Sequence, residues 1–87
     1  KKNKEIYDLV IVDLYIGDKF PKKFESKKFL RLMLRLITDN GIVVFNRLYF
    51  GEKRPQAMRF LKQLEKVFVS VGPVYPQANV MFLCYNK

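Results

Sequence analysis

The sequence predicts an α/β fold that amounts to about half of a doubly wound sheet. Two observations predict it. Short apolar runs rich in β-branched residues alternate with segments in which apolar residues recur at helical spacing, in the order strand, helix, strand, helix, short strand, strand. The longer strand-like runs are also apolar on both faces, which is typical of parallel strands covered on both sides.

The first strand and helix occupy the first half of the chain. Residues 6–15 (IYDLVIVDLY) form the predicted strand, and residues 17–21 form a loop. Ser26 has a side chain suited to capping the helix that follows it. The apolar residues of that helix fall on one face: Phe29, Leu30, Met33, Leu36 and Ile37. Gly41 ends the helix, because glycine readily adopts the left-handed conformation of a helix exit.

The second half repeats the pattern. Residues 42–46 form a strand, residues 47–53 a loop, and residues 55–68 a helix that opens on Pro55, where a first-turn proline is tolerated. The apolar stripe of this helix consists of Ala57, Phe60, Leu61, Leu64 and Phe68. Gly72 and Pro73 then break the pattern. Residues 74–75 form a short strand, Pro76 and Gln77 a turn, and residues 80–85 the last strand.

This order leaves part of the sheet uncovered. Crossovers between parallel strands are right-handed, so two successive ones place both helices on the same face of the sheet. The other face is then bare, and the first strand is an unpaired edge. We therefore expect residues 1–87 to be a single partial domain. Either further chain before Lys1 or self-association with another subunit covers the open side.

Composition excludes several classes of protein. Hydrophobic residues make up 49% of the chain and aromatic residues 15%, which rules out disorder and low complexity. A single cysteine, Cys84, excludes an internal disulfide framework, and with no histidine there is no Cys/His cluster for zinc. No apolar run approaches the ~20 residues of a membrane span, and the basic start precedes a strand, not a signal peptide. A cytoplasmic location is the default expectation.

Candidate site residues follow the first two parallel strands, because ligands of open parallel sheets bind beyond the carboxyl ends of the strands. These residues are Asp13, Tyr15, Gly17, Asp18 and Asn46, with Arg47 beside them. Asp13 directly follows a buried strand, so it is expected to be rigid and partly desolvated, as suits a base or an amine acceptor. An equally weighted reading is that Asp13 caps a loop through nearby N–H groups. Asp18 fits loop surface better.

Residues 7–48 resemble the spermidine-synthase-like branch of the class I S-adenosylmethionine-dependent transferases. The family's fourth strand ends in V-D-x-F/Y-x-G and is followed by a proline, a helix with an F-L pair, and L-x-x-x-G-[IV] before the fifth strand. The matching positions here are Val12, Asp13, Tyr15, Gly17, Pro21, Phe29, Leu30, Gly41 and Ile42, and Leu36 lies one residue farther from Gly41 than the pattern has it. Residues 79–83 look like the family's final antiparallel strand, which inserts between the fifth and sixth. The resemblance implies the C-terminal half of a Rossmann-like methyltransferase domain.

The resemblance also implies a cofactor and an acceptor site. Asp13 matches the acidic residue that opens the D-x-x-D pair of aminopropyltransferases, but Ile16 stands where the second aspartate would be. The net charge of +9 also opposes a cationic amine, so methyl transfer to another acceptor is favoured. The family's residues for S-adenosylmethionine belong to a half outside this chain, and no G-x-G pattern occurs here. The isolated chain is therefore expected to be inactive.

Two other families of function fit parts of the sequence. The strand also looks like the phosphoacceptor strand of bacterial receiver domains, but the Met-Pro that follows it there is replaced by Ile16 and Gly17. The second alternative is a basic module that binds nucleic acid or a protein partner through residues 19–28, whose lysines surround Phe20 and Phe24. Nucleic acid is not favoured, because lysines without arginine forks fit a solvated loop with both phenylalanines packed on the core.

Overall fold

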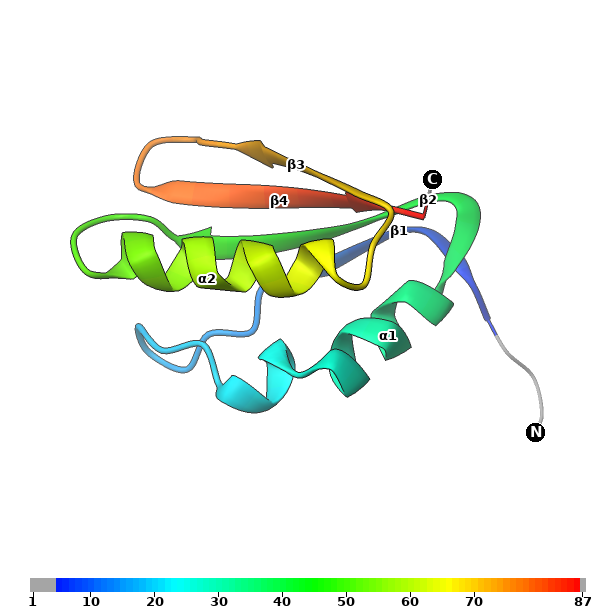
Figure 1. Cartoon of the computed structure of the whole chain (residues 1–87), viewed down its shortest axis with the longest axis horizontal. Coiled ribbons are helices and arrows are strands. Elements are labelled where there is room, and N and C mark those ends of the chain that lie inside the picture. Colours follow the sequence, from blue (N-terminus) through cyan, green and yellow to red (C-terminus); the bar gives the residue numbers. More distant parts are fainter. Residues whose placement is uncertain (1–4, 87) are drawn as a thin grey trace.

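The computed structural model describes residues 5–86 (Figure 1). In chain order, its elements are strand β1 (Tyr7–Val12), 3-10 helix η1 (Lys22–Glu25), helix α1 (Lys27–Arg35), strand β2 (Ile37–Leu48), helix α2 (Lys53–Glu65), strand β3 (Ser70–Val74) and strand β4 (Asn79–Tyr85). The basic start of the chain, residues 1–4, lies outside the described residues. Neither helix within residues 5–86 has the length and apolarity to cross a membrane.

The four strands form one sheet in the order β1-β2-β4-β3. β1 pairs with β2 in parallel, from Leu9 opposite Ile42 to Val12 opposite Phe45. β4 runs antiparallel to both β2 and β3 and lies between them. The predicted α/β class is confirmed, and so is the antiparallel last strand inserted between its two neighbours.

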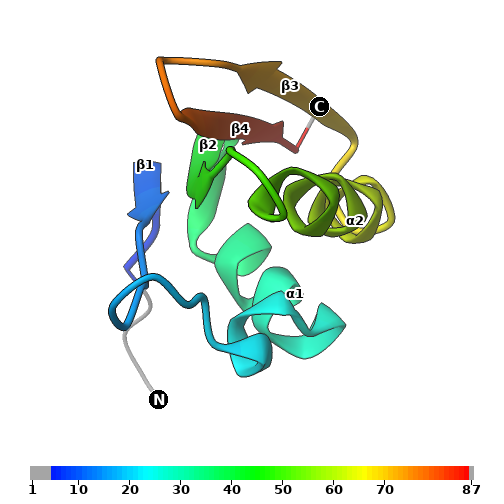
Figure 2. The same ribbon diagram turned by 90° about the vertical axis from the view of Figure 1, so that its left-hand side faces the viewer.

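Both helices pack on the same face of the sheet, which curves over them (Figure 2). Alternate residues of β2 and β4 point into this layer, and Phe45 and Phe82 are fully buried there against Phe60 of α2. On the opposite face, Leu9 is 53% and Ile11 63% exposed. β1 also forms one edge of the sheet. The predicted bare face and open edge strand are therefore both present.

The end of α1 differs from the prediction. The helix stops at Arg35, and Ile37 already pairs with Tyr7 of β1, whose N–H donates to the Leu36 carbonyl at 2.6 Å. Gly41 is not in the left-handed region and ends no helix. A Cβ on Gly41 would lie 2.8 Å from the Cβ of Ile37 and 3.0 Å from the Tyr7 carbonyl oxygen, so glycine is needed here for close backbone approach.

Other boundaries also moved. β1 is shorter than predicted and ends at Val12, whereas β2 runs to Leu48, so the predicted loop from residue 47 was wrong at its start. α2 begins two residues before Pro55, which still lies in the first turn. β3 includes Gly72 and Pro73, although these residues were expected to break the pattern. β3 is an edge strand, where the missing proline N–H costs no ladder hydrogen bond on the open side.

Candidate functional site

The carboxyl ends of β1 and β2 lie at the same end of the sheet, as predicted (Figure 1). Asp13 follows Val12 there and is exposed. Its carboxylate makes no hydrogen bond or ion pair with any residue of the described chain. The predicted partial desolvation of Asp13 is wrong, because Asp13 follows an edge strand with no neighbour on its outer side. The loop-capping alternative has no support either, since no backbone N–H donates to this side chain.

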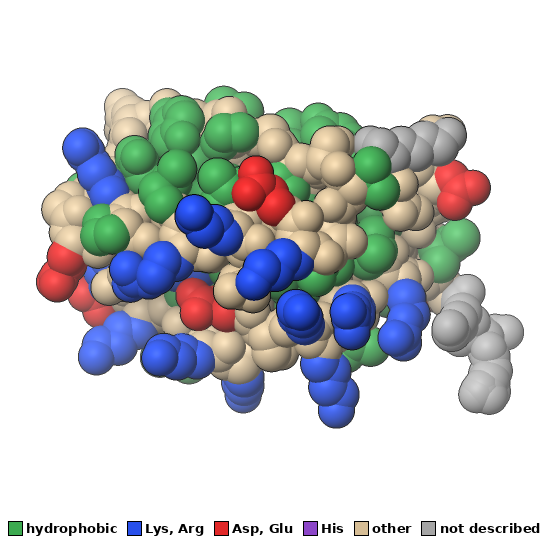
Figure 3. Space-filling model, in the orientation of Figure 1, with side chains coloured by type: hydrophobic (Ala, Val, Ile, Leu, Met, Phe, Trp, Pro, Cys, Tyr) green, Lys and Arg blue, Asp and Glu red, His purple; other side chains and the backbone are tan. Residues whose placement is uncertain are grey.

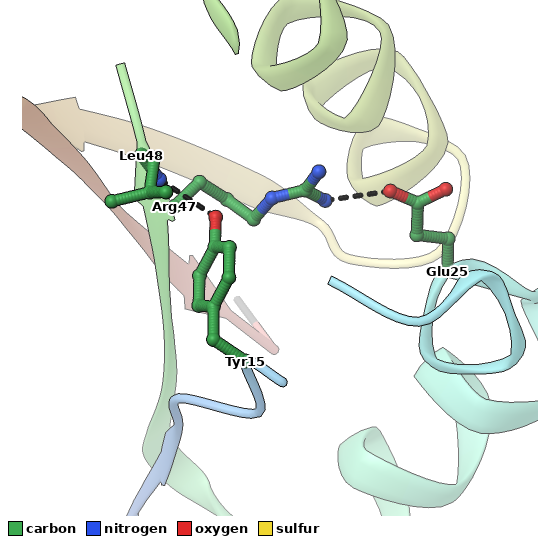
Figure 4. A network of polar contacts seen from close by, with 4 residues as sticks. All are labelled: Tyr15, Glu25, Arg47 and Leu48. Carbon is green, nitrogen blue, oxygen red and sulfur yellow. Dashed lines mark hydrogen bonds and ion pairs between the residues drawn. The ribbon is translucent and has the colours of Figure 1, made fainter. Parts of the chain in front are cut away.

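Tyr15 points inward and joins the loop to β2 (Figure 4). The backbone N–H of Leu48 donates to the Tyr15 hydroxyl at 2.7 Å. The ring packs edge-on against Phe20, with 5.5 Å between centroids. β1 has already ended at this level of the sheet, so the phenol supplies the acceptor that a further strand residue would have offered to β2.

Gly17 and Asp18 form a tight turn. Ile16 and Lys19 close it with two backbone hydrogen bonds of 2.8 and 3.1 Å, and Gly17 has a φ of +64° at its first central position. A glycine at this position is what a two-residue turn of type II′ requires. The Asp18 side chain is 72% exposed, and one carboxylate oxygen lies 4.0 Å from Lys53 Nζ, which also donates to the Asp18 carbonyl at 3.0 Å. Asp18 therefore lies on the exposed surface of the loop, as the sequence analysis favoured for this residue.

Asn46 belongs to the open face of the sheet. It alternates with Phe45 and Arg47, which point toward the helices. Its Oδ1 accepts a hydrogen bond from Asn79 Nδ2 at 3.0 Å. The structure thus joins Tyr15 to the end of β2 and Asp18 to the start of α2. Among the described residues, no hydrogen bond or ion pair links Asp13 or Asn46 to either of them.

The sequence reasoning placed Arg47 in a loop, and it did not anticipate the role of Glu25. Arg47 is a residue of β2 and is 4% exposed. Its Nη1 donates to Glu25 Oε2 at 2.7 Å (Figure 4). Its guanidinium also lies over the rings of Phe20 and Phe60, at 4.2 and 4.6 Å from their centroids. Extending the alternation of Val43 and Phe45 by two residues would have placed Arg47 on the buried face.

A pocket of about 430 Å³ opens beside this ion pair. Its walls come from η1 and the residues before it, from β2 and from α2. The lining residues are Phe20, Lys22, Glu25, Arg47, Gln56, Arg59, Phe60 and Gln63. None of the five predicted site residues lines it. Nor do residues 5–86 hold a cluster of acidic or cysteine ligands that could bind a metal ion.

Phe20, Phe24, the lysines around them and Cys84 have the burial that the sequence predicted. Phe20 is buried and Phe24 is partly buried against the same core, as the alternative of a solvated loop with core-packed phenylalanines predicted. Lys22, Lys23 and the lysines of α1 are exposed around them. Cys84 is fully buried in β4, and this burial raises the pKa of its thiol from 9.0 to about 12. A thiol with so high a pKa is no nucleophile near neutral pH.

Comparison with known proteins gives the fold. No family model and no curated protein matches this sequence. Among solved structures, the chain is similar to human methyltransferase-like protein 13, solved in complex with SAH, with a TM-score of 0.75 and 19% sequence identity. The match covers 95% of this chain and 40% of that one. The chain therefore has part of a Rossmann-like class I methyltransferase fold and spans about two-fifths of the length of the protein it matches.

Proposed function

We propose that this chain forms part of an S-adenosylmethionine-dependent transferase domain of the spermidine-synthase-like branch and supplies its acceptor side. The strand order β1-β2-β4-β3, with an antiparallel β4 inserted between two parallel strands, carries the proposal. The likeness to part of a methyltransferase-like protein supports it. In this proposal Asp13 ends the acceptor-side strand, and Tyr15, Gly17, Asp18 and Asn46 shape the surface around it.

Methyl transfer fits these residues better than aminopropyl transfer. An amine acceptor calls for two carboxylates facing one site, and the second position of the pair is Ile16, which is 74% exposed in the turn. The next carboxylate, Asp18, faces the Lys53 ammonium instead. With a net charge of +9 on the whole chain, a polyamine would be repelled at long range.

The residues described here do not make up a cofactor site. Gly17 and Gly51 lie in exposed turns, and Gly41 and Gly72 lie in strands, so no glycine-rich loop joins a strand to a helix. The pocket beside Arg47 carries three cations, which suits an anion better than a cationic sulfonium. We therefore assign S-adenosylmethionine binding to a structural half that would complete the sheet beside β1.

Calorimetry tests this assignment directly. The 87-residue chain should show no binding of S-adenosylmethionine, whereas a longer protein that also carries the residues encoded before Lys1 should bind it. In that longer protein, Asp13→Asn should lower methyl transfer and leave cofactor affinity unchanged. Tight cofactor binding by the 87 residues alone would contradict the assignment. An Asp13→Asn variant with full activity would contradict the role of Asp13.

The open side of the sheet supports a further part of the proposal. Leu9 and Ile11 are more than half exposed on β1, which is also an unpaired edge. We propose that the isolated chain self-associates through this side when nothing else covers it. Ile11→Lys should shift sedimentation profiles at tens of micromolar toward the monomer, with Lys62→Gln on the far side as control. A well-folded monomer of the unmodified chain would refute the self-association.

A basic interaction module remains the second candidate, and one observation favours it. Lysines and arginines gather over the helical side of the molecule, with few acidic side chains among them (Figure 3). Such a surface can contact nucleic-acid phosphates without reading sequence. A salt-dependent affinity for RNA that the Lys22→Glu, Lys23→Glu double variant abolishes would favour this candidate. No affinity at low salt would dismiss it.

A further inference from the structure

The pocket between η1 and α2 has the size and position of a ligand site that is separate from the surface around Asp13. Its volume of about 430 Å³ lies within the roughly 300–1,000 Å³ of small-molecule pockets. Lys22 and Glu25 approach from η1, and Arg59 and Gln63 approach from α2. The pocket is lined from η1 and α2, and these helices lie on one side of the sheet (Figure 2). The exposed apolar residues Leu9 and Ile11 belong to the opposite face.

Arg47 gives this pocket a buried cation whose N–H donors are only partly hydrogen-bonded. A guanidinium carries five N–H donors in a planar fork. Within residues 5–86, the only acceptor that Arg47 finds for them is Glu25 Oε2, and its buried Nε has no partner. The rings of Phe20 and Phe60 lie against the guanidinium, with centroids 4.2 and 4.6 Å from its carbon. A rigid guanidinium with spare donors matches the geometry of phosphate oxygens.

The charge around the pocket decides which anion fits. Lys22, Arg47 and Arg59 line it together with one carboxylate, Glu25, which leaves a net charge of +2. A phosphate monoester carries about −1.5 to −2 at neutral pH, whereas a carboxylate carries only −1. The half-buried amides of Gln56 and Gln63 add hydrogen-bond donors and acceptors along α2. We propose that this pocket binds a phosphate group, either free or at the end of a small organic molecule.

Glu25 has two opposed effects in this proposal. Its carboxylate fixes Arg47 through the 2.7 Å ion pair, and the same negative charge repels a bound phosphate. Glu25→Gln keeps an amide oxygen that can accept from Arg47 and removes the repulsion. The proposal therefore predicts that this variant binds phosphate several-fold more tightly, a gain that a merely structural pocket would not show.

A nuclear magnetic resonance titration tests the proposal on the 87-residue chain. The ¹⁵N-labelled chain is titrated with inorganic phosphate and, separately, with ribose 5-phosphate, at ionic strength held constant with sodium chloride. The Arg47 Nε–H signal should shift, with a dissociation constant below about 1 mM, equivalent to roughly −4 kcal/mol. Tighter binding of ribose 5-phosphate assigns the pocket to an organic phosphate. Equal binding of the two assigns it to the phosphate group alone.

Charge-neutralising variants separate a built site from general attraction. Arg59→Gln and Lys22→Gln, both exposed residues at the rim, should weaken binding about tenfold or more, the loss of one charge-assisted hydrogen bond. Lys62→Gln and Lys28→Gln, which are also exposed but lie outside the pocket lining, should change it less than twofold. Equal losses in all four variants would overturn the proposal. So would an unchanged Arg47 signal at 10 mM phosphate, or weaker binding by Glu25→Gln.

Discussion

Removing the carboxylate of Glu25 should destabilise the fold more than removing any exposed acidic side chain. In Glu25→Ala, Arg47 stays in β2 with its side chain only 5% exposed and loses the one acceptor it has among the described residues. Glu25 itself sits at the end of η1 with its side chain 30% exposed, so its truncation to alanine leaves little cavity. The loss of stability therefore comes almost wholly from the buried Arg47 guanidinium that is left without an acceptor.

The size of the effect can be worked from the contacts. Removing one partner of a buried ion pair costs about 3–5 kcal/mol. The rings of Phe20 and Phe60, at 4.2 and 4.6 Å, go on stabilising the cation and offset about 1 kcal/mol or more. We therefore expect a loss of about 2–4 kcal/mol, against a total of about 5–15 kcal/mol for a native domain. Glu25→Gln keeps an acceptor oxygen and should lose about 1–2 kcal/mol.

Urea unfolding followed by circular dichroism measures these losses. With an m-value of about 1–3 kcal/mol per molar urea, the midpoint of Glu25→Ala should fall by about 1–2 M. The matched control is Glu65→Ala, which truncates an exposed acid of α2 and should cost under about 0.5 kcal/mol. A second test places Glu25→Ala in an Arg47→Met background, where the loss should largely vanish. An undiminished loss there, or equal losses in the two glutamate variants, would refute the ion-pair explanation.

Two further predictions concern single buried positions. Gly41→Ala should lower the free energy of unfolding in urea by about 1–3 kcal/mol, because the added Cβ would lie 2.8 Å from the Cβ of Ile37. The control Gly72→Ala, which has open space around it, should change that free energy by less than about 0.5 kcal/mol. Similar losses in the two variants would contradict the explanation by close approach. Burial raises the pKa of Cys84 to about 12, so the unfolded chain releases this proton first and stability should fall between pH 9.0 and about 12. Cys84→Ala should flatten this part of the pH profile, and an unchanged slope would show that the thiol does not cause it.

The topology could be predicted because it depends on patterns that the tertiary structure does not override. Alternating strand and helix segments, with right-handed crossovers, place both helices on one face whatever the exact boundaries are. The capping role of Ser26 was equally local, since its hydroxyl accepts the Phe29 N–H three residues later at 3.1 Å. These inferences needed only neighbouring residues and the handedness of the chain.

The errors arise where a distant segment decides the local structure. In the sequence alone, Gly41 has the features of a helix exit. In the structure β1 lies beside it, and the close Tyr7 carbonyl oxygen explains why this position needs a glycine. Arg47 reads as a surface cation until Glu25, Phe20 and Phe60 surround its guanidinium. Tyr7 lies more than twenty residues from Gly41 in the sequence, and Glu25 lies more than twenty residues from Arg47. Asp13 shows the opposite error, since a residue after a two-sided apolar strand is buried only when another strand covers that edge.

The positively charged pocket and the exposed apolar surface of the sheet lie on different faces of the molecule. Leu9 and Ile11, which are more than half exposed, lie on the open face and edge of the sheet. The pocket beside Arg47 opens on the helical layer instead. A structural half or a second copy that covers the sheet would therefore leave this pocket accessible. Phosphate binding and completion of the sheet can then be tested independently, because Arg59→Gln and Ile11→Lys act on opposite sides of the same chain.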